Sequence, residues 1–402
     1  MHIYRKTTII IILSLLIVIY SSICTAVKTY DLARALSQRQ DYVSDEIYYV
    51  DTARRYLQII FNIKLNYYHY SNSTDQNYFN LEHPPLGKYI IALSMLACGD
   101  RPICWKIPGV IEASLIPVIL YVGFLIRGLK ENSTIWIVAG ALAAVAAASD
   151  RILHVDGSVA MLDIHLSFFI AIAIALGVAY SYKAGLAGGS IATTVKMSGL
   201  AAVGGAALAM LLDAIAERSI RNFVRVIALS IIFVILAWVL MYAPLVGYFG
   251  PGRLYTETVN ALKWHTTSRP PGPPTSTPIG WVFNTNPFVL SYSLVDAAAR
   301  TTTIMEASGL VAGIVLSIYS LYLALSGVKT WWPVGSLTLV STYLMYAAIY
   351  ALGNHTFYSF YAVQLTPAAA ASLGELVVFG VRGAMFAGRG AHRNTSSGQA
   401  VR

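Results

Sequence analysis

Long, nearly uncharged apolar runs recur along the chain, and they constrain its fold more than any other feature. Thr7 to Ala26 is the first, and runs of similar length follow at Ile107 to Ile126, Val226 to Tyr248 and Ala307 to Leu325. A bilayer-spanning helix needs about 20 such residues. Hydrophobic residues make up 56% of the chain and charged residues only 12%, whereas soluble domains are about a quarter charged. We therefore predict an all-α polytopic membrane protein, a single bundle of about ten transmembrane helices.

Basic residues at the ends of the apolar runs predict the topology. Cytoplasmic loops carry an excess of Lys and Arg, and Arg5 and Lys6 precede the first run. This places the N-terminus in the cytoplasm and two large loops, residues 27–88 and 249–303, on the external face of the cell membrane. The basic segment 382–402 is expected to be a disordered cytoplasmic tail. Cytoplasmic loops then account for the formal charge of +9, and because no basic soluble face is visible, we predict no nucleic-acid partner.

The segment from Ala184 to Leu212 can be read in two ways. As one helix it would leave Arg218 and the two arginines that follow it on the external side, against the positive-inside rule. As two short legs, Ala184 to Val195 and Met197 to Leu212, it returns them to the cytoplasm and puts Lys196 at the external turn. We favour the two-leg reading; the alternative is a lysine that snorkels from a single helix.

One stretch of the first external loop is more polar than its surroundings. It opens with Asp45-Glu46 and closes with the run His83-Pro84-Pro85-Leu86-Gly87-Lys88. Aromatic and apolar residues between Tyr48 and Phe61 repeat at near-helical spacing, which predicts an amphipathic helix at the interface. Ionisable groups at a membrane boundary are expensive and usually mark function, so we interpret this stretch as the floor of an active site.

These residues carry a family resemblance. Ser44-Asp45-Glu46, followed by His83 to Lys88, resembles the first external loop of the protein O-mannosyltransferases, as a prokaryotic-type member would. Weaker matches follow in the same order, at Met161-Leu162-Asp163, Lys196 to Leu200 and Tyr358 to Pro367. The resemblance implies a GT-C fold over residues 1–381. It also implies that the enzyme transfers a sugar, expected to be mannose, from polyprenyl (dolichyl) phosphate to a Ser or Thr hydroxyl of an extracytoplasmic protein.

The charges assigned to the external face suit this chemistry. Asp45 is the predicted general base that removes the proton from the incoming hydroxyl, and the resemblance implies the same role; Glu46 is expected to orient the loop or the acceptor. Direct displacement inverts the anomeric centre and needs one base, unlike the two carboxylates of glycosidases. Cations can hold the leaving phosphate. The predicted donor-site residues are His83, Lys88, Arg151, Asp163 and Lys196, with Asp163 orienting a cation or binding a sugar hydroxyl.

Plainer roles compete with several of these assignments. Asp45-Glu46 could simply start a helix and interact with its dipole, and Lys88 could snorkel at a helix start. The sequence also departs from the family pattern, which has an Arg about five residues before the Asp of its Leu-Asp motif, where this chain has Gly157-Ser158. Arg151, further upstream, is the candidate substitute. His265 and His355 are predicted to be external and could meet substrate, but we interpret them as ordinary loop histidines.

No cofactor is predicted. Asp45, Glu46 and Asp163 offer oxygen ligands for a divalent ion, but a single-phosphate leaving group needs less metal assistance than a diphosphate. Cys98 and Cys104 either pair in an external loop or remain thiols. The expected partners are the lipid-linked sugar, the acceptor, membrane lipids and a second subunit in a homo- or heterodimer. Two alternatives stay open: the same fold with a lipid or glycan acceptor or a pentose donor, and a non-catalytic transporter of lipid-linked sugar.

Overall fold

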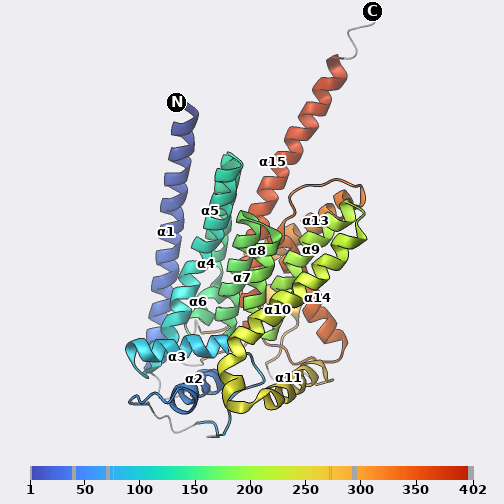
Figure 1. Ribbon diagram of the computed structural model, residues 1–402. Coiled ribbons are helices and arrows are strands. Elements are labelled where there is room, and N and C mark those ends of the chain that lie inside the picture. The colour runs from blue at the N-terminus through green and yellow to red at the C-terminus, as the bar shows by residue number, and fades with distance from the viewer. Residues whose placement is uncertain are drawn as a thin grey trace, which may run out of the picture.

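The protein forms a bundle of long helices capped at one end by short ones (Figure 1). The computed structural model describes residues 2–38, 42–68, 73–75, 77–270, 272, 274–291 and 297–396, with side chains between 6 and 381. Within these residues the secondary structure is helical apart from two isolated β-bridges. The long helices are α1 (His2–Ser37), α4 (Pro102–Lys130), α5 (Thr134–Ser149), α7 (Leu162–Ala179), α9 (Leu200–Ala216), α10 (Ile220–Phe249), α13 (Thr303–Leu325), α14 (Val334–Ala351) and α15 (Thr366–Ser396).

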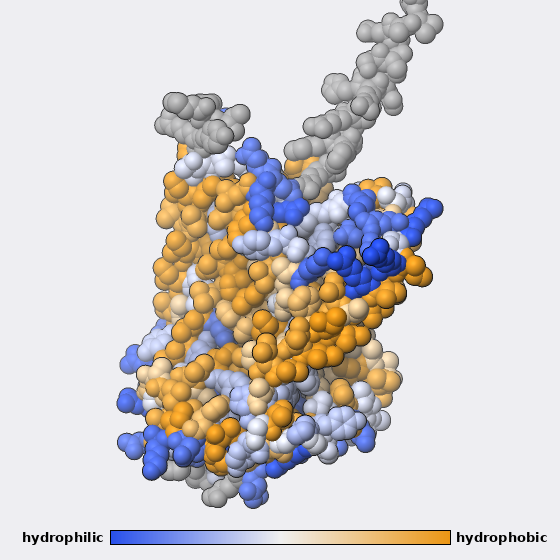
Figure 2. All heavy atoms as spheres, in the orientation of Figure 1, coloured by the Kyte–Doolittle hydropathy of each residue, from blue (hydrophilic) through white to orange (hydrophobic). Residues whose placement is uncertain are grey.

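Among the described residues, eight helical segments are long and apolar enough to span a membrane. The count becomes nine if α5 and the short α6 (Arg151–Gly157), which meet at a bend of 61°, form one broken span. Figure 2 shows the matching apolar band, with polar surface gathered at both ends of the bundle. The protein is therefore an integral membrane protein. This agrees with the predicted bundle of about ten helices; α8 (Tyr182–Ala192), one of the predicted legs, has 11 residues and is not among these segments.

Most helix starts and ends agree with the apolar runs, but α1 continues to Ser37, past the predicted end at Ala26 and into the segment expected to begin the first external loop. α5 covers the predicted run from Thr134 to Ser149, and α10 ends at Phe249, where the second large loop was expected to begin. The two separate legs are confirmed: α8 and α9 are antiparallel neighbours, and Lys196 lies in the turn between them, whose external position stays a prediction. The segment after Val381, expected to be disordered, continues α15 to Ser396, since no proline interrupts its hydrogen-bond ladder; residues 397–402 lie outside the described range.

Short helices close one end of the bundle, opposite the end at which α1 begins and α15 finishes (Figure 1). They are α2 (Glu46–Arg55) with a π-helical turn (Tyr56–Ile60), α3 (Leu86–Cys98), α11 (Pro251–Thr266) and α12 (Pro278–Val282). The amphipathic helix predicted after Asp45 is thus confirmed as α2. α3 lies across the bundle end, and a disulfide between Cys98 and Cys104 joins it to α4.

Small residues let the central helices pack closely. A Cβ on Gly123 of α4 would lie 2.7 Å from the Ala175 Cα of α7, and one on Gly205 of α9 would lie 2.6 Å from the Thr338 Cα of α14. Such contacts are typical of helix packing in membranes, where dispersion rather than water exclusion drives association. The resulting rigid bundle carries the capping helices and loops that form the site.

Candidate active site

Two cavities meet beside α11, where the capping helices join the bundle. The larger has a volume of about 630 Å³ and a mixed polar and aromatic lining, and the smaller has about 170 Å³ and a mostly apolar lining. Five residues line both cavities: His83, Lys196, His265, Thr356 and Tyr361. The larger cavity is completed by Asp45, Tyr48, Tyr49, Tyr78, Asn80, Glu82, Glu257, Asn260, Ala261, Trp264, Arg269 and Tyr358, and the smaller by Met197, Ser198, Leu200, Leu262, Thr266, Met345, Tyr346, Ile349 and Phe357.

Asp45 lies at the start of α2 and lines the larger cavity. Ser44 before it has a φ of +53°, so the chain turns sharply into the helix. The Asp45 carboxylate makes no capping hydrogen bond to α2, which leaves it available to the cavity rather than committed to the helix end. Burial raises the pKa of Asp45 to about 6; the positive charge of Lys196 opposes this shift and the negative charge of Asp163 adds to it. A carboxylate with this pKa is suited to accepting a proton near neutral pH.

Glu46 points away from the cavity and fixes the loop that carries Asp45. Its fully buried carboxylate pairs with Lys106 of α4 at 2.8 Å and accepts hydrogen bonds from the backbone nitrogens of Val43 and Ala160, at 2.9 and 2.8 Å. These contacts tie the start of α2 to two other parts of the bundle. Of the two roles predicted for Glu46, the structure favours orienting the loop.

Glu46→Gln is expected to lower the melting temperature of the protein. The substitution leaves the ammonium of Lys106 buried without a carboxylate, and breaking a buried ion pair from one side costs about 3–5 kcal/mol. Thermal unfolding in detergent measures the effect. The double variant Glu46→Gln, Lys106→Met should recover part of the loss, because it leaves no uncompensated charge. Equal stabilities of all three proteins would contradict this assignment.

Lys196 and Asp163 form a buried pair at the junction of the cavities. The Lys196 ammonium lies 2.8 Å from Asp163 Oδ1 and 3.9 Å from the centre of the Tyr361 ring. Asp163 Oδ1 also accepts a hydrogen bond from Gln364 at 3.0 Å, while Oδ2 is buried without a partner among the described atoms. Asp163 thus holds the Lys196 ammonium where both cavities can reach it.

The His83-Pro84-Pro85 turn is held next to the Lys196 turn. The backbone nitrogen of Leu86 donates to the Thr194 carbonyl at 2.9 Å, which joins two segments that are far apart in sequence. His83 faces both cavities, and its ring centre lies 6.2 Å from that of His265. Burial and the charges of Lys196, Lys88 and His265 hold the pKa of His83 well below its usual range. The imidazole is therefore neutral at pH 7 and offers a hydrogen bond rather than a charge.

Lys88 has a different place from the one predicted. Its side chain is fully buried, and its ammonium donates to the Asn80 carbonyl and side-chain oxygens and to the His83 carbonyl. Because these bonds use all three donors of a lysine, Lys88 stabilises the turn that presents His83 and does not reach the cavities. Arg151 also lies outside the linings of both cavities, at the start of α6, where its backbone nitrogen donates to Thr302.

Arg269 is a site residue that the sequence analysis missed. It lines the larger cavity with its guanidinium 4.2 Å from the Trp264 ring, and its Nε is buried without a hydrogen-bond partner among the described residues. A short parallel bridge between Arg269 and Asn354 fixes its backbone. Arg269, and not Arg151, is therefore the arginine that lines the cavity. His265, interpreted as a loop residue, also belongs to the site, and burial with the charges of Lys196 and Arg269 lowers its pKa to about 4.

The acidic residues are not arranged as a metal centre in the described part of the chain. No group of three or more His, Cys, Asp or Glu side chains there could hold a metal ion. Glu46, one of the three carboxylates considered as ligands, is turned toward Lys106.

The fold and this arrangement of helices define a class. The chain is an all-helical membrane bundle that shares its fold with a solved membrane protein. ArnT from Cupriavidus metallidurans shares the fold: its structure bound to undecaprenyl phosphate superposes with a TM-score of 0.54 at 12% sequence identity, over 88% of this chain and 59% of that chain. The apo structure of the same protein gives a TM-score of 0.51 at 13% identity, over 88% and 58%. The chain thus spans less than two thirds of the length of ArnT. No family model and no curated protein matches the chain.

Proposed function

We propose that this protein is an inverting glycosyltransferase that uses a polyprenyl-phosphate sugar as donor. The observation that carries the proposal is the junction of an apolar and a polar cavity at the Lys196 ammonium, with the carboxylate of Asp45 in the polar one. A lipid-linked sugar has the same order of parts: an isoprenoid chain, a phosphate and a sugar. The fold shared with ArnT, which has been crystallised with undecaprenyl phosphate, supports the same donor class.

The reaction follows from this placement. With the isoprenoid in the smaller cavity, the phosphate lies at Lys196 and Arg269, and the sugar projects toward Asp45. Asp45 takes the proton of the acceptor hydroxyl while the oxygen of that hydroxyl attacks the anomeric carbon of the sugar. The bond from that carbon to the phosphate oxygen breaks, its electron pair stays on the leaving polyprenyl phosphate, and the cations stabilise the charge that develops there. One displacement inverts the configuration.

The sugar and the acceptor are assigned from the family resemblance. We propose mannose as the sugar and a Ser or Thr hydroxyl of an extracytoplasmic protein as the acceptor, with the site on the external face and both termini in the cytoplasm. The larger cavity is lined by residues of α2 and α11, which lie at the bundle end opposite the start of α1 (Figure 1), and this is the arrangement that the topology requires. A glycan or lipid acceptor would use the same site.

Purified protein in detergent tests the proposal. It is incubated with radiolabelled dolichyl- and undecaprenyl-phosphate mannose, a pentose analogue, and acceptors that comprise Ser/Thr peptides and a cell-envelope extract. Transfer of label to any acceptor supports the enzyme class, and the labelled product identifies the acceptor. Binding of the donors without transfer to any acceptor would instead favour a transporter of lipid-linked sugar.

The transfer rate should fall in acid. Burial raises the pKa of Asp45 to about 6, and a general base acts only as the carboxylate. The active form is therefore complete well above pH 6, and kcat/KM should lose about tenfold per pH unit below it. The profile is measured from about pH 4.5 to 8, with samples returned to neutral pH and assayed again to exclude acid unfolding. A flat profile across this range would assign the base elsewhere.

A further inference from the structure

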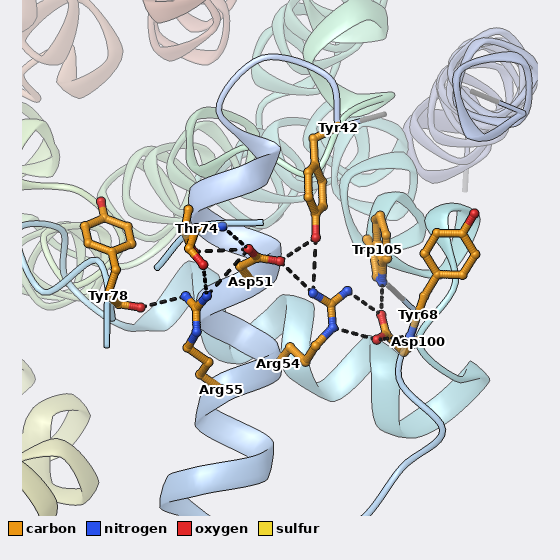
Figure 3. A network of polar contacts seen from close by, with 9 residues as sticks. All are labelled: Tyr42, Asp51, Arg54, Arg55, Tyr68, Thr74, Tyr78, Asp100 and Trp105. Carbon is orange, nitrogen blue, oxygen red and sulfur yellow. Dashed lines mark hydrogen bonds and ion pairs between the residues drawn. The ribbon is translucent and has the colours of Figure 1, made fainter. Parts of the chain in front are cut away.

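A buried ion network occupies the helix that carries Asp45. Asp51, Arg54 and Arg55 lie about two to three turns after Asp45 on α2, and their side chains are at most 9% exposed. Figure 3 shows Asp51 between the two arginines, with Arg55 bonded to Tyr78 on one side and Arg54 bonded to Asp100 on the other. None of the three lines either cavity, so the proposed chemistry leaves this costly group of charges unexplained.

One arm of the network holds the segment around Thr74. Asp51 Oδ2 accepts hydrogen bonds from the Thr74 backbone nitrogen and hydroxyl, at 2.8 and 3.1 Å. Arg55 donates to the carbonyls of Thr74 and Tyr78, at 2.8 and 2.7 Å. The described residues of this segment form no helix or strand, so contacts from α2 set the position of its backbone.

The segment held in this way supplies a wall of the larger cavity. Tyr78 lines that cavity, and its hydroxyl donates to Glu82 and accepts from Asn80. Its ring packs edge-on against Tyr48, with 5.9 Å between the ring centres. Four residues line the polar cavity beside Asp45 and do not line the apolar one: Tyr48, Tyr78, Asn80 and Glu82. We call these four residues the acceptor wall.

The other arm fixes α2 to the turn between α3 and α4. Arg54 binds both oxygens of Asp100, at 2.7 and 3.1 Å. Asp100 also accepts from the Trp105 indole and from the Tyr68 backbone nitrogen, each at 2.7 Å. The Cys98–Cys104 disulfide closes this turn on either side of Asp100. One end of the network is thus anchored to the bundle and the other holds the acceptor wall.

We propose that Asp51, Arg55, Arg54 and Asp100 are positioning residues that set the acceptor wall relative to Asp45. The inference rests on the proposed function, because it assigns this wall to the acceptor and not to the donor lipid. The two cations proposed to hold the donor phosphate, Lys196 and Arg269, come from other segments, so loosening the wall should leave them in place. Misplacement of about 1 Å can cost up to about 100-fold in rate.

The test is Arg55→Gln in the full-length protein, assayed with dolichyl-phosphate mannose and a peptide or glycan acceptor that the wild type accepts. We expect kcat/KM for the acceptor to fall at least about tenfold, with the donor KM changed less than about twofold. Arg55→Lys keeps the charge but lacks the bidentate geometry of a guanidinium. Its kcat/KM for the acceptor should lie between the values of the wild type and Arg55→Gln. Lys64→Gln, which removes an exposed cation of the same loop, is the matched control. The proposal would be overturned if kcat/KM fell equally for donor and acceptor, or if it fell for neither.

Amide hydrogen exchange provides a readout that does not depend on turnover. Arg55→Gln and Asp100→Asn should speed exchange in residues 77–82 and leave residues 353–364 unchanged. If the wild-type protein transfers no sugar, the proposed function is refuted. The exchange measurement still decides in that case whether the network positions the acceptor wall. Unchanged exchange in residues 77–82 would refute the positioning role even in an active enzyme.

Discussion

Replacing Asp45 by Asn is expected to lower kcat by about 10²–10⁴-fold, the usual contribution of a general base. Asparagine has nearly the same shape and cannot accept the proton. The Asp45 side chain makes no capping hydrogen bond to α2, so the fold should tolerate the change. The substitution also removes a negative charge near Lys196, and an anionic donor should therefore bind at least as tightly as in the wild type. Lost transfer with retained donor binding is the signature of a missing base.

Single-turnover transfer in detergent, together with donor binding measured separately, provides this comparison. Asp75→Asn is the matched control, since Asp75 is an aspartate of the same loop and does not line either cavity. It should retain wild-type transfer. If Asp45→Asn transfers sugar at the wild-type rate, another group accepts the proton, and the neutral His83 and His265 become the next candidates.

The fold could be read from the sequence because a membrane leaves few choices. Apolar length fixed the long helices, and charge asymmetry placed the turn at Lys196, which a hydropathy average alone would have buried in a helix. The same charges did not reveal which way each side chain points. Glu46 and Lys88 were recognised as unusual, yet both are turned inward, where they meet Lys106 and the Asn80 carbonyl. Motif spacing predicts that a charged residue matters without predicting what it contacts.

Arg269 shows the other limit of the sequence. It stands alone in a Pro-rich loop, and no local pattern distinguishes it from a solvated cation. Its place in the cavity depends on a bridge to Asn354, 85 positions later (354 − 269), and on a Trp264 ring presented by the end of α11. Contacts of this kind come from the tertiary fold. His265 was undervalued for the same reason, because only the packing of α11 brings it to His83.

Lys196→Gln should lower kcat/KM by about 10²–10³-fold, comparable to the loss of one strong donor aimed at a developing oxyanion. The ammonium is the cation at which the two cavities meet, and Asp163 and the Tyr361 ring hold it in place. Unlike Asp45→Asn, this change should weaken donor binding as well as turnover. Transfer and donor affinity, measured on the same preparation, separate the two phenotypes. An unaltered donor affinity would place the phosphate elsewhere, with Arg269 as its nearest alternative.

A loss of activity in Lys196→Gln could also arise from instability, because the substitution leaves the buried Asp163 with only Gln364 as a partner among the described residues. Breaking a buried ion pair from one side costs about 3–5 kcal/mol. The double variant Asp163→Asn, Lys196→Gln separates the two causes, since it removes the uncompensated charge and should regain stability. If Lys196 acts on the phosphate, the double variant stays inactive although it is stable. If activity returns with stability, Lys196 serves only to neutralise Asp163, and the phosphate site must be sought around Arg269.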